Sequence, residues 1–74
     1  MENIEEKYKK QSIERFDFIS EEYLNKLKQE NVKTLGQLSN KTSRDLKSYG
    51  FENFEIKKID RELQFLGLNL KNSL

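Results

Sequence analysis

A glycine turn followed at once by a helix is the part of this sequence whose residue types could do chemistry. Residues 49–60 read YGFENFEIKKID, in which Gly50 can make a tight turn and a helix can start near Asn53. Free main-chain N–H groups at the start of a helix bind phosphate, and a glycine lets the backbone come close to it. The turn also carries Glu52 and Glu55, whose negative charge opposes an anion. The stretch therefore leaves two alternatives, a nucleic-acid contact or a hairpin that has lost it.

Catalytic side chains are scarce in the rest of the chain. The sequence contains no cysteine and no histidine, which excludes thiol nucleophiles, imidazole bases and zinc sites built from these ligands. No pair of carboxylates stands out from the scattered acids as a candidate for acid–base catalysis. We therefore expect no enzyme activity, no cofactor, no metal and no small-molecule substrate.

The charge balance does not indicate a polyanionic partner. The chain has 14 lysines and arginines against 13 acids, a net charge of +1, whereas dedicated nucleic-acid binders are strongly basic. No apolar run approaches the ~20 residues that span a bilayer, and the start, MENIEEKYKK, lacks the apolar stretch of a signal peptide. We expect a soluble, cytoplasmic protein without membrane contact.

Helix start and stop signals predict the elements that must position the glycine turn. Residues 1–12 are mostly charged, and their glutamate–lysine pairs stabilise a helix by only about 0.2–0.5 kcal/mol each, so we expect a charged tail or a frayed helix there. One domain is expected over residues 13–74. Its predicted helices span residues 21–30, 35–39, 43–48 and 53–66.

The predicted helix ends depend on a few polar residues. Ser20, Thr34 and Thr42 are expected to begin helices, because each hydroxyl can accept a main-chain N–H in the first turn. Asn31 and Gly67 are expected to end helices in the left-handed conformation.

The apolar residues recur at helical spacing and predict one core. The expected core residues are Ile13, Phe16, Ile19, Tyr23, Leu24, Leu27, Leu35, Leu38, Leu46, Tyr49, Phe51, Ile56, Ile59, Leu63, Leu66, Leu68 and Leu70, with Phe18 as a second apolar contact. No alternating β-branched run is present, so strands are not expected. The predicted fold is a compact all-α bundle of four to five short helices.

The residues from 24 to 70 form an ordered pattern: N-x-LK, V-x-T-L-G-x-L, T-x-x-DL and an isoleucine-containing helix that ends in LGLNL. This pattern resembles the C-terminal domain of the bacterial RNA polymerase alpha subunit, which is built from paired helix-hairpin-helix units. The resemblance covers nearly the whole chain after residue 12. It implies a bacterial transcription module with that fold.

Such domains bind the minor groove of AT-rich promoter DNA and receive contacts from transcription regulators. Their DNA surface combines the start of the first full helix with the turn before the last helix, so that two helix N-termini point at phosphates. The resemblance places the equivalent surface, called the partner face below, at Glu22, Asn25, Lys26, Glu52, Asn53, Phe54 and Glu55.

The partner face departs from the family at the positions that contact DNA. Glu22 stands where the family has an arginine, whereas the family asparagine three residues later is retained as Asn25. Glu52 replaces a glycine, and Phe54 and Glu55 replace a lysine and a serine. A carboxylate about 4 Å from a phosphate costs about 1 kcal/mol in water and up to ~4 kcal/mol near a protein surface. We expect this face to repel DNA.

The preferred hypothesis is a module that acts by protein contact, with a regulator or the polymerase in the transcription apparatus as its partner. The rival is a DNA-binding helix-hairpin-helix domain that contacts the backbone through a basic patch, Lys57, Lys58 and Arg61. The acids at the helix starts and the two phenylalanines of the last helix each have an alternative interpretation. Acids such as Glu21 also stabilise helix N-termini by about 0.3–1 kcal/mol each, and Phe54 and Phe65 are either partner anchors or edges of the core.

Overall fold

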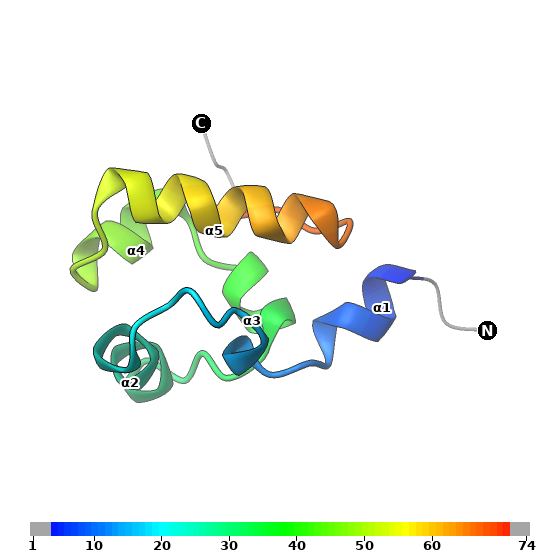
Figure 1. Cartoon of the computed structure of the whole chain (residues 1–74), viewed down its shortest axis with the longest axis horizontal. Helices are drawn as coiled ribbons and strands as arrows, with labels where there is room; N and C mark the ends of the chain where they lie inside the picture. Colours follow the sequence, from blue (N-terminus) through cyan, green and yellow to red (C-terminus); the bar gives the residue numbers. More distant parts are fainter. Residues whose placement is uncertain (1–3, 72–74) are drawn as a thin grey trace.

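The computed structural model describes residues 4–71, with side chains from Lys7 onward, and this part of the chain forms an all-α fold (Figure 1). Its elements are α1 (Ile4–Lys9), a 3₁₀ turn η1 (Ile13–Arg15), α2 (Glu21–Gln29), α3 (Leu35–Ser39), α4 (Ser43–Ser48) and α5 (Asn53–Phe65). In Figure 1, α5 runs along one side of the molecule with α4 beside its start, α2 lies on the opposite side, and α3 lies between them. Residues 4–71 contain no strand, so the predicted all-α class is confirmed.

The predicted helix starts are confirmed by their capping bonds. Thr34 Oγ1 accepts the Gln37 N–H at 3.1 Å, and Thr42 Oγ1 accepts the Asp45 N–H at 3.0 Å. The Thr42 main-chain N–H in turn donates to the Asp45 carboxylate at 3.0 Å, and this bond holds the pKa of Asp45 below its ordinary value. Such reciprocal bonds satisfy donors that the first turn of a helix leaves without partners.

Three helices end in the same way. Asn31, Gly50 and Gly67 follow α2, α4 and α5 with φ values of 63°, 100° and 80°. In each case the next residue donates its N–H to a carbonyl five positions earlier: Val32 to Leu27, Phe51 to Leu46 and Leu68 to Leu63. All six of these residues are buried, so each turn also brings an apolar side chain back onto the core. α2 and α5 end at residues 29 and 65, one residue before the predicted ends, because Glu30 and Leu66 are already C-caps.

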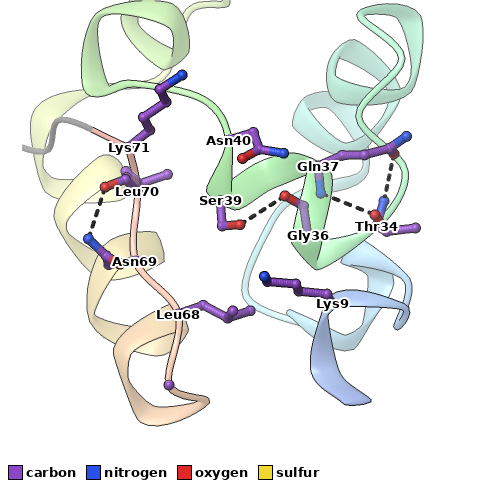
Figure 2. A pocket seen from close by; sticks show the side chains of 11 residues that line it. Lys9, Thr34, Gly36, Gln37, Ser39, Asn40, Leu68, Asn69, Leu70 and Lys71 are labelled. Atoms are coloured by element: carbon purple, nitrogen blue, oxygen red, sulfur yellow. Dashed lines mark hydrogen bonds between the residues drawn. The ribbon is translucent and has the colours of Figure 1, made fainter. Parts of the chain in front are cut away.

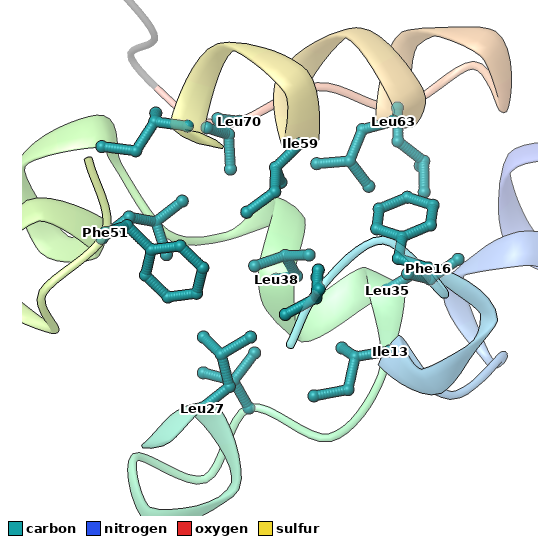
Figure 3. Close-up of a cluster of buried hydrophobic side chains, with 14 residues drawn as sticks. Ile13, Phe16, Leu27, Leu35, Leu38, Phe51, Ile59, Leu63 and Leu70 are labelled. Carbon is teal, nitrogen blue, oxygen red and sulfur yellow. The ribbon is translucent and has the colours of Figure 1, made fainter. Parts of the chain in front are cut away.

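One hydrophobic core lies between α5 and the other elements (Figure 3). Its buried members are Ile13, Phe16, Ile19, Leu27, Val32, Leu35, Leu38, Leu46, Phe51, Ile56, Ile59, Leu63, Leu68 and Leu70. Figure 3 shows Ile59 and Leu63 of α5 pointing toward Leu35 and Leu38 of α3. Burial of such side chains contributes about 1.5–3 kcal/mol each and is the main force that holds this small fold together. Tyr23, Leu24, Tyr49 and Leu66, predicted as core residues, are only partly buried against it.

The described part of residues 1–12 packs on α3. α1 contacts α3 next to Gly36, where an added Cβ would lie 3.0 Å from the Cβ and the carbonyl oxygen of Lys9. The Gln11 carbonyl accepts the Leu35 N–H at 2.8 Å. Residues 1–3 and 72–74 lie outside the described residues, and the boundary at residue 13 stays a prediction.

A side chain of α5 holds the segment that follows it. Asp60 Oδ1 accepts the Leu70 N–H at 2.9 Å, and Asp60 Oδ2 accepts the Gln64 side-chain amide at 3.0 Å. The segment thereby places Leu68 and Leu70 in the core, as predicted. Asp60 therefore has a structural role that its position between the basic residues of α5 did not indicate.

Candidate partner-binding face

The start of α2 and the turn before α5 lie side by side and form the partner face. Gly50 adopts a φ of 100° with open space around its Cβ position, so its conformation rather than a close contact requires glycine here. The turn sends Phe51 into the core, where its ring stacks on Tyr23 of α2 with centroids 4.6 Å apart and an interplanar angle of 24°. This contact joins the two helix starts.

The charges of carboxylates at both helix starts act on the Tyr23 side chain. Its pKa is raised above the ordinary 10.0, first by partial burial and then by Glu55, which acts through its charge and as a hydrogen-bond acceptor. Glu52 and Glu22 raise the same pKa through their charges. Three acids that the sequence placed at two separate helix starts thus act on one phenol, Tyr23.

Glu55 also accepts a hydrogen bond from a main-chain N–H of the turn. Its Oε1 accepts the Glu52 N–H at 2.9 Å. An N–H group at a helix start is the kind of donor that binds phosphate, and in this protein a carboxylate of the chain itself takes it. The spacing of Glu52 and Glu55, three residues apart, is that of a capping box, a signal from which this bond could have been predicted.

Two hollows open on the partner face, and Tyr23 lines both. One, of about 130 Å³, lies between aromatic and apolar residues: Phe18, Ile19, Tyr23, Phe51, Phe54, Glu55, Lys58 and Ile59. The other, of about 480 Å³, is lined by Glu22, Tyr23, Asn25, Lys26, Gln29, Tyr49 and Gly50. The first is smaller than the ~300 Å³ of a typical small-ligand pocket. It is of a size to receive one apolar side chain.

The predicted site residues are divided between these hollows. Glu22, Asn25 and Lys26 line the larger one, and Phe54 and Glu55 line the smaller one. Glu52 and Asn53 are exposed but line neither hollow. Lys26 is paired with Glu30 of the same helix at 3.5 Å. The structure adds Phe18 and Tyr23, which the sequence assigned to the core.

Phe54 is the exposed apolar side chain of this face. It is 66% exposed, whereas Phe51, three residues earlier, is 4% exposed. Phe18 is half-buried, stacks on Phe16 with centroids 5.3 Å apart, and has the Lys58 ammonium 4.8 Å from its ring centroid. The face therefore combines an exposed ring, a small apolar hollow and carboxylates.

The basic patch lies on the outer side of α5. Lys57, Lys58 and Arg61 are all exposed, and within the described chain none of them has a carboxylate partner within 4 Å. Asp60, which follows two of these residues, binds Leu70 instead of a neighbouring cation. Lys71 lies away from the patch, on another hollow.

That other hollow, of about 650 Å³, lies between α3 and the segment after α5 (Figure 2). Several of its polar groups already have partners in the chain. Thr34 accepts the Gln37 N–H, and the Ser39 hydroxyl donates to the Gly36 carbonyl at 2.8 Å. The Asn69 side-chain amide donates to the Leu70 carbonyl at 3.2 Å.

Residues 7–71 contain no group of three or more acids that could hold a metal ion. Within residues 4–71, the helices are all too short or too polar to cross a membrane. No protein-family model matches the chain, and no curated protein shows significant sequence similarity to it.

Proposed function

We propose that this chain is a small module of the transcription apparatus that acts by protein contact through the partner face. The resemblance to the polymerase alpha C-terminal domain supplies the biological setting, and a regulator or the polymerase is the partner it suggests. The observation that carries the contact is the exposed ring of Phe54 beside a small apolar hollow that Tyr23 and Glu55 also line. The charges of Glu22, Glu52 and Glu55, which together raise the pKa of Tyr23, add negative charge to this surface. A face of this kind attracts a protein surface with cations and an apolar side chain.

The same geometry argues against DNA at this face. A phosphate would meet three carboxylates, and the Glu52 N–H that could bind it already donates to Glu55. Each acid near a phosphate costs about 1 kcal/mol or more. Counterion release, which supplies most non-specific DNA affinity, requires cations that the face lacks apart from Lys26, which is paired with Glu30.

Fluorescence anisotropy with an AT-rich duplex at low salt tests this proposal. We expect no binding in the micromolar range. The double variant Glu22→Arg, Glu52→Gly restores the family residues, and adding Glu55→Ser frees the Glu52 N–H. We expect these changes to raise DNA affinity by about a hundredfold or more, because each removed carboxylate is worth about 1 kcal/mol, an arginine is gained, and about 1.4 kcal/mol is a factor of ten.

A matched control carries the same charge change elsewhere on the surface. Glu14→Arg with Asp17→Asn also raises the net charge by three, at exposed residues outside the partner face, and leaves the Lys26–Glu30 pair in place. It should raise DNA affinity much less than the variants of the partner face. An equal gain would mean that only net charge matters, and no gain in either variant would mean that the face does not have the geometry of a DNA contact.

The rival function, DNA binding through the basic patch, rests on a separate observation. Lys57, Lys58 and Arg61 are exposed without acid partners in the described chain. If they bound phosphates, the unaltered protein would bind the duplex with a salt slope of about −2.7, from ~0.9 per phosphate contact. Lys57→Gln with Arg61→Gln would then abolish binding. That pair of results would replace the protein-contact proposal with this rival.

A further inference from the structure

The two exposed large apolar side chains among residues 7–71 lie on one line of α5. Phe54 is 66% exposed and Phe65 is 75% exposed. They are eleven residues apart, which is about three helical turns and about 16 Å, so they point to the same side of the helix. Lys58 and Arg61 fall four and seven residues after Phe54, on that same side. These four residues are called the α5 ridge below.

The α5 ridge is not needed for the core. Ile56, Ile59 and Leu63, the buried residues of α5, lie on the opposite side of the helix. Both cations of the ridge are exposed, as are both rings. A single exposed apolar side chain is common on a protein surface. Two rings on one line of a helix, with two cations between them, form an ordered pattern that a partner of complementary pattern could cover.

The order of rings and charges along the α5 ridge indicates what kind of surface would fit it. A helix laid along the ridge would need an apolar residue near each phenylalanine and carboxylates between them, near Lys58 and Arg61. Two helices paired in this way bury both rings and match the two cations with acids. Two residues eleven positions apart lie on the same side of any α-helix, so the partner helix can carry its two apolar residues at the same spacing as the two phenylalanines of α5.

Charge decides between the possible occupants. In a symmetric antiparallel pair of two copies that joins Phe54 to Phe65, Lys58 of one copy faces Arg61 of the other, and like charges repel. A nucleic acid carries a charge at every nucleotide and would pass the half-buried carboxylates of Glu55 and Glu62 beside the ridge. An acidic helix can confine its charges to the two positions that face Lys58 and Arg61, so it avoids the first conflict and brings fewer charges past these acids than a nucleic acid does.

We propose that the α5 ridge binds an acidic amphipathic helix of another protein, with apolar residues at its ends and carboxylates at its centre. This goes beyond the proposed function, although two ridge residues also reach the partner face: Phe54 belongs to it, and Lys58 lines its smaller hollow with the ammonium 4.8 Å from the Phe18 ring centroid. Arg61 and Phe65 line neither hollow of that face. The two can fail separately: removal of the acids of the partner face leaves the ridge intact, and removal of Arg61 or Phe65 leaves the partner face intact.

A synthetic peptide is the probe. It is alanine-rich and helical, has two leucines eleven residues apart and glutamates four and seven residues after the first leucine. A second peptide has lysines in place of the glutamates. The ¹⁵N-labelled full chain is titrated with each peptide at low salt and followed by NMR. We expect the acidic peptide to shift the amide signals of α5 and the lysine peptide to bind at least tenfold more weakly.

Variants locate the contact. Phe65→Ala should weaken binding of the acidic peptide about tenfold, and Arg61→Gln should weaken it several-fold, as is typical for an aromatic anchor and a charged neighbour. Neither should lower Tm, because both side chains are exposed. Glu22→Gln on the partner face and Lys47→Gln on α4 serve as controls and should leave the affinity unchanged.

Three results would overturn the inference. Equal binding of both peptides, or shifts confined to residues outside α5, would show that the ridge does not read this charge pattern. Shifts of α5 signals with protein concentration alone, abolished by Phe65→Ala, would assign the ridge to a second copy. Tighter binding of a single-stranded oligonucleotide than of the acidic peptide would assign it to nucleic acid.

Discussion

Replacement of Asp60 by alanine should selectively release the segment after α5. The Leu70 N–H, which donates to Asp60 Oδ1 at 2.9 Å, belongs to a residue with 0% exposure, so the variant leaves this donor without its partner. A hydrogen bond to a charged group contributes about 1.5–3 kcal/mol. Asp60 is only half-buried, and water weakens such bonds, so we expect a loss of about 1–2 kcal/mol.

The ceiling of this effect follows from what the segment buries. If residues 67–71 detach completely, Leu68 and Leu70 leave the core, which costs about 1.5–3 kcal/mol for each side chain. A chain of this length has a total stability of roughly 4–11 kcal/mol, at about 0.05–0.15 kcal/mol per residue. Complete detachment would cost about 3–6 kcal/mol in all, a large part of that total, and would leave the fold marginal.

Urea unfolding and native-state amide exchange measure the two effects separately. We expect the Leu70 amide of the Asp60→Ala variant to exchange much faster than the Ile59 amide, which reports the centre of α5. Asp60→Asn retains a carbonyl oxygen as acceptor and should restore most of the protection. Asp17→Ala, at an exposed acid in the same chain, controls for the loss of one charge. Unchanged exchange at Leu70 in Asp60→Ala would refute the role assigned to this bond.

Two further predictions concern α1 and the partner face. Gly36→Ala places a Cβ 3.0 Å from Lys9, so it should displace α1 and lower the free energy of unfolding by about 1–3 kcal/mol. Amide exchange at residues 7–9 should become faster. Unchanged exchange there would contradict the close packing of α1 on α3. The raised pKa of Tyr23 means that its neutral phenol stabilises the fold below pH 10.0, the ordinary pKa, and that this contribution is lost as the pH rises through the folded-state pKa. Glu55→Gln should lower the pKa of Tyr23 toward 10.0, whereas the control Glu14→Gln should not. The absorbance of tyrosinate measures this pKa, and the variant Tyr23→Phe identifies which tyrosine gives the signal. An unaltered titration in Glu55→Gln would show that Glu55 does not act on Tyr23.

The helix boundaries were predictable because their signals are local. A cap joins residues within about four positions, so Thr34 with Gln37 and Thr42 with Asp45 were recognisable as pairs in the sequence. The apolar periodicity of α5 likewise predicted which of its residues are buried.

The partner face could be predicted only in part. The positions of Glu22, Glu52 and Glu55 at helix starts were predictable. For Phe54 the sequence left two alternatives, an exposed partner anchor or an edge of the core. The stack of Tyr23 on Phe51 was not, because the two residues are far apart in sequence and both were expected in the core.

The sequence alone thus determined the helices from residue 21 onward, their ends to within one residue, and which residue types lie at each start. Tertiary structure decided which of these residues meet. Asp60 binds Leu70, Gly36 admits Lys9, and Phe54 and Phe65 remain in solvent. The physical reason is range: caps and turns act over a few residues, whereas these contacts depend on how the core orients one helix against another.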